Sequence, residues 1–249
     1  DPNGRPIRRA DVTVELTRHA FKFGANGFNL RSIEDPGLQD AYEARFAALL
    51  NYATLPFYWG GYEREPGQTR ESHLHEMAAW CRDHGVATKG HPLVWHEVSP
   101  QWAADFSDEE VLARLAARTR TLPAQFRGEV DIWAVVNEAT VSPRYDNAVG
   151  RWVAREGATD AVATALGWAQ AGNPAATFLY NDFNLSPAFE SLVGALLGRG
   201  APVGAIGIQS HMHQGTWSLA KAWDVCETYV RFELPLHFTE LTVLSGALK

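Results

Sequence analysis

An alternation of short β-type runs with amphipathic helical stretches constrains the fold of this chain more than any other sequence feature. Seven runs rich in β-branched and aromatic residues are separated by stretches in which apolar residues recur at three- and four-residue intervals. Strands that alternate with helices predict a parallel sheet covered by helices. The runs are Phe21–Asn26, Tyr52–Phe57, Ala87–Trp95, Asp131–Glu138, Thr177–Asn184, Ala205–Met212 and Leu234–Leu241.

The stretch Asp108–Thr121 has the clearest amphipathic pattern. Val111 and Leu115 fall on one face, whereas Arg114 and Arg118 are expected to remain in contact with water. Four other stretches behave similarly and supply the outer helical layer. They are Asp40–Leu50, Ser72–His84, Thr159–Ala171 and Pro187–Arg199.

Polar residues gather at the C-terminal end of nearly every predicted strand. In a parallel barrel this end carries the chemistry, because the loops after the strands converge there. An open, doubly wound sheet would need a phosphate-binding turn after its first strand, and Phe23–Phe28 lacks the GxGxxG pattern. We therefore predict an α/β fold of the (β/α)8 TIM-barrel type. The strand-end residues are Asn26, His91, Trp95, Asn137, Glu138, Asn181, Asp182, Gln209, His211 and Glu240.

The last βα unit of such a barrel is not visible in the sequence. Thr242–Lys249 follows the seventh run and is too short for another strand and helix. We expect residues 21–249 to form a catalytic (β/α) barrel that is incomplete at its C-terminus, either as a fragment or with an unusual closure. Residues 1–20 are predicted to form an N-terminal β element, which leads into the barrel or ends a preceding β domain.

Charge and hydropathy exclude two classes of partner. The net charge of −7 argues against nucleic acid, because binding a phosphate backbone needs a concentrated basic surface. No run of about 18 apolar residues occurs, so no membrane-spanning segment is predicted. The nine Trp and seven Tyr residues are compatible with stacking on sugar rings and equally with core packing, so they do not decide between the two.

The two cysteines, Cys81 and Cys226, lie far apart in separate helical stretches. Neither belongs to a CxxC pair, so no metal site is expected. Two buried free thiols are favoured over a structural disulfide.

Glu138 and Glu240 each belong to an apolar strand. Burying a glutamate is unfavourable by several kcal/mol unless the group is paired or neutralised. A single such residue has the alternative explanation of a salt bridge at a strand end. Two of them on separate strands, each near His, Asn or Gln, favour a catalytic carboxylate pair.

These strand ends lie within longer motifs, and the order and spacing of five of them resemble those of glycoside hydrolase family 10. That family consists of β-1,4-xylanases on a (β/α)8 barrel, and the resemblance covers roughly Phe21 to Leu241. One motif alone would carry little information, but five in order are highly specific. The motifs are Lys89–His96, Trp133–Glu138, Tyr180–Asn184, Ile206–His211 and Phe238–Leu241.

The resemblance implies a retaining mechanism with Glu138 as general acid/base and Glu240 as nucleophile. Such a mechanism needs carboxyl groups about 5–5.5 Å apart. Glu138 is expected to be protonated and Glu240 ionised near neutral pH, since mutual repulsion separates the pKa values of two neighbouring carboxyl groups.

The resemblance also implies partners for this pair. Asn137 is expected to donate to the sugar 2-OH, a contact that strengthens in the transition state. His211 is expected to bond to Glu240, with Gln209 beside it on the same strand face. A satisfied structural histidine is the alternative for His211.

His91 and Trp95 resemble the residues that hold and floor the sugar cleaved at its reducing end, with a structural role as the alternative for His91. Asn181 and Asp182 are expected to line the leaving-group side, unless they cap the turn after their strand. The roles of Lys89 and His96 remain open, and Lys89 is either a strand-entry charge or a ligand.

The second strand departs from the family pattern. Family members carry a Glu-Asn pair and a Lys near this strand, which bind two sugars on the non-reducing side, but Thr54–Gly61 is two residues shorter and lacks those groups. Weakened or altered sugar binding is expected there, because hydrogen-bonding sites discriminate strongly. Tyr58, Trp59 and Tyr62 either form a sugar platform or pack the loop.

Two single replacements also fall near the expected site. Val98 stands where a sugar-binding Gln is usual. Thr242 replaces an Asp two residues after the expected nucleophile, so the support for His211 is altered.

The sequence therefore predicts a retaining, endo-acting glycoside hydrolase that cleaves β-1,4 linkages in xylan or a related plant polysaccharide. Its expected partner is a xylan-like polysaccharide or oligosaccharide, without nucleic acid, membrane, metal or organic cofactor. By resemblance we expect a monomer in a secreted or extracytoplasmic location. The alternatives are a retaining glycosidase or transglycosylase on another β-glycan, and a non-catalytic carbohydrate-binding barrel or inactive fragment.

Overall fold

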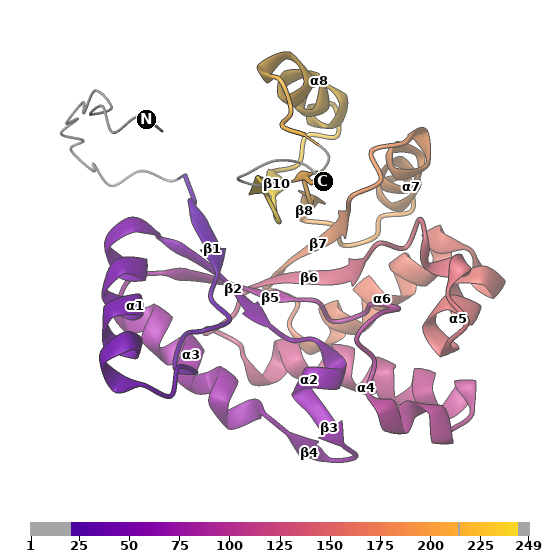
Figure 1. Ribbon diagram of the computed structural model, residues 1–249. Helices are drawn as coiled ribbons and strands as arrows, with labels where there is room; N and C mark the ends of the chain where they lie inside the picture. The colour runs from indigo at the N-terminus through magenta and orange to yellow at the C-terminus, as the bar shows by residue number, and fades with distance from the viewer. Residues whose placement is uncertain (1–20, 214, 244–249) are drawn as a thin grey trace.

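A computed structural model describes residues 21–213 and 215–243. Seven parallel strands curl into a half-barrel with helices around it, which confirms the predicted TIM-like α/β class and the lack of closure (Figure 1). Within the described part of the chain, β1 and β10 each have one neighbour in this sheet. In spatial order the strands are β1 (Gly24–Asn26), β2 (Tyr52–Pro56), β5 (Ala87–His91), β6 (Ile132–Asn137), β7 (Thr177–Asp182), β8 (Ala205–Ile208) and β10 (Leu236–Phe238).

The five predicted helices are present with boundaries shifted by a few residues. They are α1 (Pro36–Leu49), α3 (Glu71–Asp83), α4 (Asp108–Gln125), α6 (Ala158–Gly172) and α7 (Pro187–Gly198). Other elements were not among those predicted. They are α2 (Trp59–Tyr62), α5 (Ala148–Glu156), the 3-10 turns Gln101–Asp105 and Ser142–Arg144, the antiparallel pair β3 (Glu63–Glu65) and β4 (Gln68–Thr69), and β11 (Thr242–Val243). Helix α8 (Leu219–Val230) is the helical stretch expected around Cys226. Strand β9 (His211–Met212), which pairs with β11 in parallel, is the end of the predicted run Ala205–Met212 and is separate from β8.

Helix α4 shows how local chemistry sets the boundaries of an element. Ser107 starts it with a capping box, in which Glu110 N donates to Ser107 Oγ and Ser107 N donates to Glu110 Oε2. The predicted end at Thr121 was too early. Pro123 cannot donate a backbone hydrogen bond, yet the helix continues through it, and Phe126 N bonds to Leu122 O at 3.0 Å.

Arg118 of α4 was wrongly predicted to remain in water. Its side chain is buried, and the guanidinium donates to the carbonyls of Leu93 (2.5 Å) and Phe57. The physical reason is spacing: three and four residues separate Arg118 from the buried Leu115 and Leu122, so all three share the face turned to the sheet. Burial lowers the pKa of Arg118 to about 10, so the guanidinium stays charged at neutral pH.

The main core lies against β6. Trp133 is fully buried, and its ring centroid lies 4.7 Å from that of Phe57 and 6.4 Å from that of Phe126. Gly90 of β5 meets the same ring, since a Cβ there would approach the Trp133 ring to 2.4 Å. The neighbouring residue Ala134 belongs to a second, small cluster, as expected where successive strand residues face opposite sides.

Both cysteines are free thiols, as favoured from the sequence. Cys81 is buried, but Cys226 is only half-buried, so the prediction of two buried thiols holds for one of them. None of the helices described is both long and apolar enough to cross a membrane. The N-terminal β element predicted for residues 1–20 lies outside the described residues.

Candidate active site

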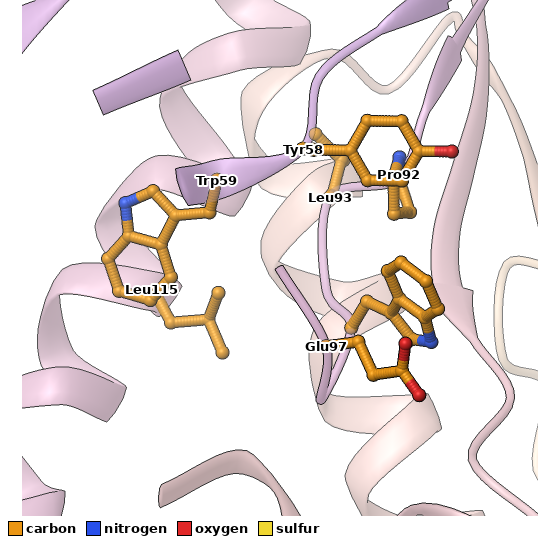
Figure 2. Close-up of a pocket in the computed structure, with 7 residues that line it drawn as sticks. Tyr58, Trp59, Pro92, Leu93, Glu97 and Leu115 are labelled. Atoms are coloured by element: carbon orange, nitrogen blue, oxygen red, sulfur yellow. The ribbon is translucent and has the colours of Figure 1, made fainter. Parts of the chain in front are cut away.

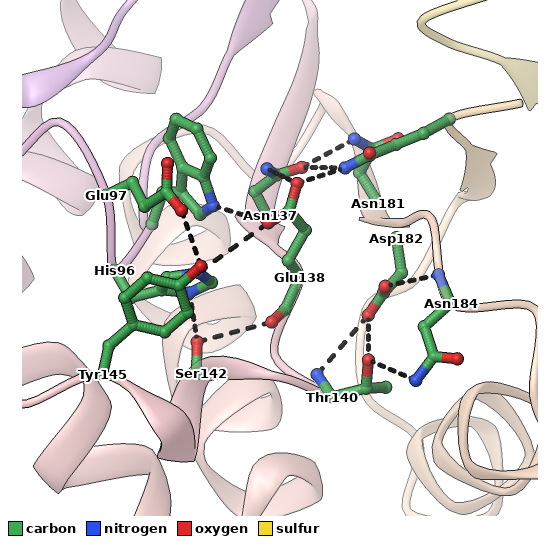
Figure 3. A network of polar contacts seen from close by, with 12 residues as sticks. His96, Glu97, Asn137, Glu138, Thr140, Ser142, Tyr145, Asn181, Asp182 and Asn184 are labelled. Carbon is green, nitrogen blue, oxygen red and sulfur yellow. Dashed lines mark hydrogen bonds and ion pairs between the residues drawn. The ribbon is translucent and has the colours of Figure 1, made fainter. Parts of the chain in front are cut away.

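The two candidate carboxylates lie at the C-terminal ends of their strands. Glu138 immediately follows β6, and Glu240 lies two residues after β10. The polar residues predicted at the ends of β5 to β8 converge around them, and part of this network is drawn in Figure 3. Asn26 is not brought into the network. It is exposed at the end of β1, the strand at the far edge of the sheet.

Three donors surround the Glu138 carboxyl group. Gln209 Nε2 and Asn137 Nδ2 donate to Oε1 at 2.7 and 3.0 Å, and Trp95 Nε1 donates to Oε2 at 3.1 Å. His96 Nε2 lies 3.7 Å from Oε2. The donors leave the side chain little orientational freedom, so the carboxyl oxygens have defined directions in the site.

The backbone at Glu138 is unusual, with φ at 58°. A non-glycine residue in the left-handed region is uncommon and is held there by its surroundings. The Glu138 carbonyl accepts from the backbone N–H groups of Val141 and Ser142, both at 3.2 Å. Ser142 Oγ in turn lies 2.6 Å from His96 Nδ1, which ties this turn to the loop after β5 (Figure 3).

Asp182 fastens the same turn from β7. This fully buried side chain accepts from Thr140 Oγ1 at 2.8 Å, from the backbone N of Asn184 at 2.9 Å and from the Tyr180 hydroxyl. All these groups donate, which is the pattern an ionised carboxylate satisfies. Asp182 therefore holds the Glu138 turn and, through the Asn184 N–H, caps the turn after its own strand, which is the alternative given for it from the sequence. Contact with a leaving group stays a prediction.

Glu240 has different neighbours. Asn181 Nδ2 donates to its Oε1 at 2.7 Å, His91 Nε2 lies 3.6 Å from the same oxygen, and His211 Nε2 lies 3.3 Å from Oε2. Thr239 Oγ1 donates to Asn181 Oδ1 at 2.5 Å, which fixes the amide so that its nitrogen faces Glu240.

Asn137 connects the two halves of the site. Its Oδ1 accepts from Asn181 Nδ2 at 2.7 Å and from Gln209 Nε2 at 3.2 Å, while its own amide nitrogen donates to Glu138. The two carboxylates are thus linked through one chain of amide groups, from Glu240 through Asn181 and Asn137 to Glu138.

The prediction that Gln209 and His211 share a strand face is wrong. Strand β8 ends at Ile208, and Ser210 has φ at 56°, which turns the chain between the two side chains. Gln209 therefore reaches Glu138, whereas His211 begins β9 and reaches Glu240.

His211 lacks support on its other ring nitrogen. Its Nδ1 is buried without a hydrogen-bond partner among the described residues. Thr242 pairs with His211 in the β9–β11 register, but its hydroxyl donates to the Glu240 carbonyl at 3.0 Å. The altered support expected at Thr242 therefore takes this form: His211 contacts Glu240 through Nε2 but has no hydrogen bond at Nδ1 among the described residues.

The electrostatics distinguish the site residues. Burial raises the pKa of Glu138, with smaller contributions from the negative charges of Asp182 and Glu240, and the hydrogen bonds from Gln209 and Trp95 oppose the rise. Burial holds the pKa of His91 well below its usual range, and it lowers the pKa of His96 to about 4. Both imidazoles are therefore neutral near pH 7, and their contacts with the carboxylates are not charged ion pairs.

Lys89 is not a strand-entry charge. It is 1% exposed, and burial lowers its pKa to about 8 while the negative charge of Glu240 partly restores it. Its charge also lowers the pKa of His91 and, less than burial does, that of His237. Lys89 thus places a buried cation within the electrostatic reach of Glu240.

The aromatic residues after β2 divide into two groups. Trp59 and Tyr62 are buried, and Trp59 packs on Trp102 with centroids 5.6 Å apart, so they pack the loop instead of forming a platform. In Figure 2 the Trp59 ring lies beside Leu115, whereas the Tyr58 ring points away from both. Tyr58 alone turns to the site, with its ring centroid 5.5 Å from that of His91 and 5.8 Å from that of Trp95.

Three residues around Glu138 were not predicted. Ser142 and Thr140 hold its turn, and the Tyr145 ring packs on His96 at a tilt of 37°, with centroids 3.9 Å apart. Their position within seven residues of Glu138 was the available signal, since the loop after a barrel strand faces the site. Among the described residues, no group of His, Cys, Asp and Glu is arranged to hold a metal ion.

Solved structures share this architecture. A family 10 structure from Paenibacillus barcinonensis superposes with a TM-score of 0.76 at 20% identity, covering 92% of this chain and 72% of that one, and it shows the fold. Xylanase 10B from Thermotoga petrophila RKU-1, solved in complex with xylobiose, gives a TM-score of 0.74 at 25% identity, covering 91% of this chain and 71% of that one.

Sequence relatives point the same way. Endo-1,4-beta-xylanase B of Paenibacillus barcinonensis is 31% identical over 179 residues, 67% of this chain and 53% of that protein. A beta-1,4-xylanase of Dictyoglomus thermophilum is 32% identical over 151 residues, 58% of this chain and 41% of that protein. The chain thus spans about half the length of these relatives. The family described as Glycosyl hydrolase family 10 matches residues 38–247. This chain belongs to glycoside hydrolase family 10.

Proposed function

We propose that the chain is a retaining glycoside hydrolase that cleaves internal β-1,4 linkages of xylan or a related plant polysaccharide. The observation that carries the proposal is the linked carboxylate pair in unlike surroundings. Glu138 is held by three donors in a site that raises its pKa, and Glu240 lies beside the neutral imidazole of His91 and the Lys89 charge.

In the first step Glu138 gives its proton to the glycosidic oxygen while Glu240 attacks the anomeric carbon. The bond from this carbon to the leaving oxygen breaks with its electron pair, and a glycosyl ester with Glu240 forms. The raised pKa of Glu138 supports its role as the acid, because a protonated carboxyl group is needed at this point.

In the second step the ionised Glu138 takes a proton from water, and the water oxygen attacks the same carbon. The ester bond breaks, Glu240 leaves as a carboxylate, and Glu138 is protonated again. Asn137 retains one amide hydrogen beyond the one it donates to Glu138, and this group is the proposed donor to the sugar 2-OH.

The substrate part of the proposal comes from relatives. They are named as xylanases, and one was solved with xylobiose. A polymeric substrate of this kind is too large to enter a cell, so the proposal includes an extracytoplasmic location. Action as a monomer is included only by resemblance to the family. Residues 21–249 are the proposed catalytic barrel.

The test is turnover of an aryl β-xyloside and of xylo-oligosaccharides by this chain and by a version extended through an eighth strand and helix. Glu240→Ala is expected to abolish turnover. Added azide is expected to restore turnover in both variants. The product should be a glycosyl azide of inverted configuration with Glu240→Ala and of retained configuration with Glu138→Ala. The matched control is Glu227→Gln, an exposed carboxylate on α8.

Full turnover by Glu240→Ala would remove the nucleophile assignment. Product analysis on several β-glycans separates xylan from another glycan and hydrolysis from transglycosylation. Binding of xylobiose without turnover by either form of the wild-type chain would instead favour a carbohydrate-binding barrel.

A further inference from the structure

The loop after β2 presents one aromatic side chain to the site. Phe57, Trp59 and Tyr62 on either side of Tyr58 are buried in the core and under the helices. The half-buried Tyr58 ring instead meets the imidazole of His91 edge-on, at an interplanar angle of 82°, and is tilted at 52° to the indole of Trp95.

The backbone around Tyr58 is fastened on both sides. Before it, Phe57 N donates to His91 O at 2.7 Å, and the Phe57 carbonyl accepts from Arg118. After it, Gly60 N donates to Val98 O at 2.8 Å.

Gly60 also allows the two loops to meet closely, because a Cβ there would lie 2.8 Å from the carbonyl oxygens of Val98 and Ser99. Arg118 bridges the same two loops by donating to the Leu93 carbonyl as well. The Tyr58 ring is therefore mounted on a rigid connection to the strand that carries His91 and does not swing freely over the site.

The Tyr58 hydroxyl group has no hydrogen-bond partner among the described residues. Burial raises its pKa, and the charges of Glu240 and Glu138 add to the rise. The hydroxyl thus stays protonated within the field of both carboxylates. It is available as a donor to an oxygen atom of a molecule bound between them.

The loop itself offers few other means of recognition. Thr54 to Tyr62 contains no charged side chain, and Thr54 is buried within β2. The side of this loop that faces the site, which consists of Tyr58 and the backbone next to it, is called the wall below. It recognises a ligand by aromatic contact and one hydroxyl group. Apolar surfaces discriminate weakly between ligands that differ by one small group.

We propose that Tyr58 is a sugar-contacting, specificity-determining residue, which packs on the C–H face of the pyranose unit beside Glu240 and donates its hydroxyl hydrogen to that unit. The inference rests on the proposed function for the presence of a β-linked pyranoside in this site. It adds that the site binds xylo- and gluco-configured units with similar affinity, because the wall has no hydrogen-bonding group that depends on the C5 substituent.

The experiment is a ligand-observed NMR titration of the chain with xylobiose and with cellobiose. Variants Tyr58→Phe and Tyr58→Ala are compared with wild type, and the matched control is Trp223→Ala, an exposed aromatic residue on α8. Thermal unfolding of each variant verifies folding. The spectra of the same samples report any hydrolysis products.

We expect Tyr58→Ala to weaken xylobiose binding about tenfold or more, and Tyr58→Phe by about threefold. Trp223→Ala should bind as wild type, and xylobiose and cellobiose should bind wild type within about tenfold of each other. Saturation from the protein should concentrate on the axial C–H protons of one sugar face.

Unchanged xylobiose affinity in a folded Tyr58→Ala variant would overturn the proposal, and so would the absence of binding to wild type. A strong preference for xylobiose would overturn the part on configuration. Binding that depends on Tyr58, in a chain that also fails to cleave xylo-oligosaccharides, would support the role of Tyr58 in binding and remove the proposed hydrolase function, so the two failures are distinguishable.

Discussion

The two candidate catalytic residues are supported by regions of very different construction. Glu138 follows β6, which has strands on both sides, and its turn is fastened by Asp182 from β7 and by His96 from the loop after β5. Glu240 follows β10, which within the described residues pairs only with β8. The Glu240 side chain is also more exposed than that of Glu138, at 22% against 12%.

This difference indicates that the surroundings of Glu138 are built from central strands of the described chain, whereas those of Glu240 depend on an edge strand. Strand β10 contributes three residues, two of them half-buried and one exposed. An edge strand keeps unpaired backbone groups on one side and opens more readily than a central strand. The following predictions compare the two halves directly.

The largest expected effect is on stability. Trp133→Ala removes a fully buried ring from beside β6 and should lower the free energy of unfolding by about 3–5 kcal/mol. Leu236→Ala on β10 removes a half-buried side chain and should lower it by about 1 kcal/mol. Denaturant unfolding of both variants measures the difference, and equal losses would contradict the comparison.

The second-largest expected effect is a difference in backbone hydrogen exchange between the regions around Glu138 and Glu240. The amides of Thr239 and Glu240, which donate to Ile208 O and Gln209 O, are expected to exchange at least about 100-fold faster than those in β6 and β7. Exchange measured by NMR or mass spectrometry on the wild-type chain gives the ratio. Protection of β10 equal to that of β6 would show that the edge strand is as stable as the centre.

The pKa of Glu138 should respond to Asp182. The negative charge of Asp182 contributes to raising that pKa, so Asp182→Asn should lower it, and Glu138 should lose its proton at lower pH. The indole N–H of Trp95, which donates to Glu138, reports this titration by NMR. Any activity should then fall at lower pH on its alkaline side.

Asp105→Asn, an exposed carboxylate in a 3-10 turn, serves as the control for this titration. It should leave the Trp95 titration where it is in wild type. A Glu138 titration that stays in place or moves upward in Asp182→Asn would show that the lost hydrogen bonds outweigh the lost charge.

The smallest effect is expected for two matched threonines. Thr140→Val removes the donor to buried Asp182, and Thr242→Val removes the donor to the Glu240 carbonyl. Thr140→Val should lower the free energy of unfolding by about 1–2 kcal/mol and Thr242→Val by about 0.5–1 kcal/mol. The first change is larger because it leaves a charged acceptor with one partner fewer. Thermal or denaturant unfolding provides both values, and the reverse order would contradict the comparison.

The strand pattern could be predicted because it depends on local sequence. Apolar runs such as Thr177–Asp182 and the polar residues that end them place the site at one edge of a parallel sheet. Helix α5 was missed although Asn147 caps it. It directly follows the 3-10 turn Ser142–Arg144, and no strand before it marks the start of a new βα unit. The resemblance to the family supplied the acid and nucleophile roles, which remain proposals.

Side-chain partners could not be predicted where the backbone departs from regular geometry. The turn at Ser210 sends Gln209 and His211 to different carboxylates, although a regular strand would put them on one face. Arg118 was misjudged because its burial depends on carbonyl groups supplied by two distant loops. The first error comes from a local backbone turn at Ser210. In the second, spacing puts Arg118 on the buried face of α4, and the distant carbonyl groups allow its charge to be buried there.

The left-handed backbone of Glu138 has a consequence for how this protein can change. A residue with a Cβ in this region carries a cost of roughly 1 kcal/mol or more relative to glycine. Selection for stability alone would favour Gly or Asn at this position, whereas selection for the acid role proposed for Glu138 would retain Glu. A lineage without the proposed activity is therefore expected to replace Glu at residue 138, and a thermostable relative with Gly there would be recognisable as a barrel without the proposed acid.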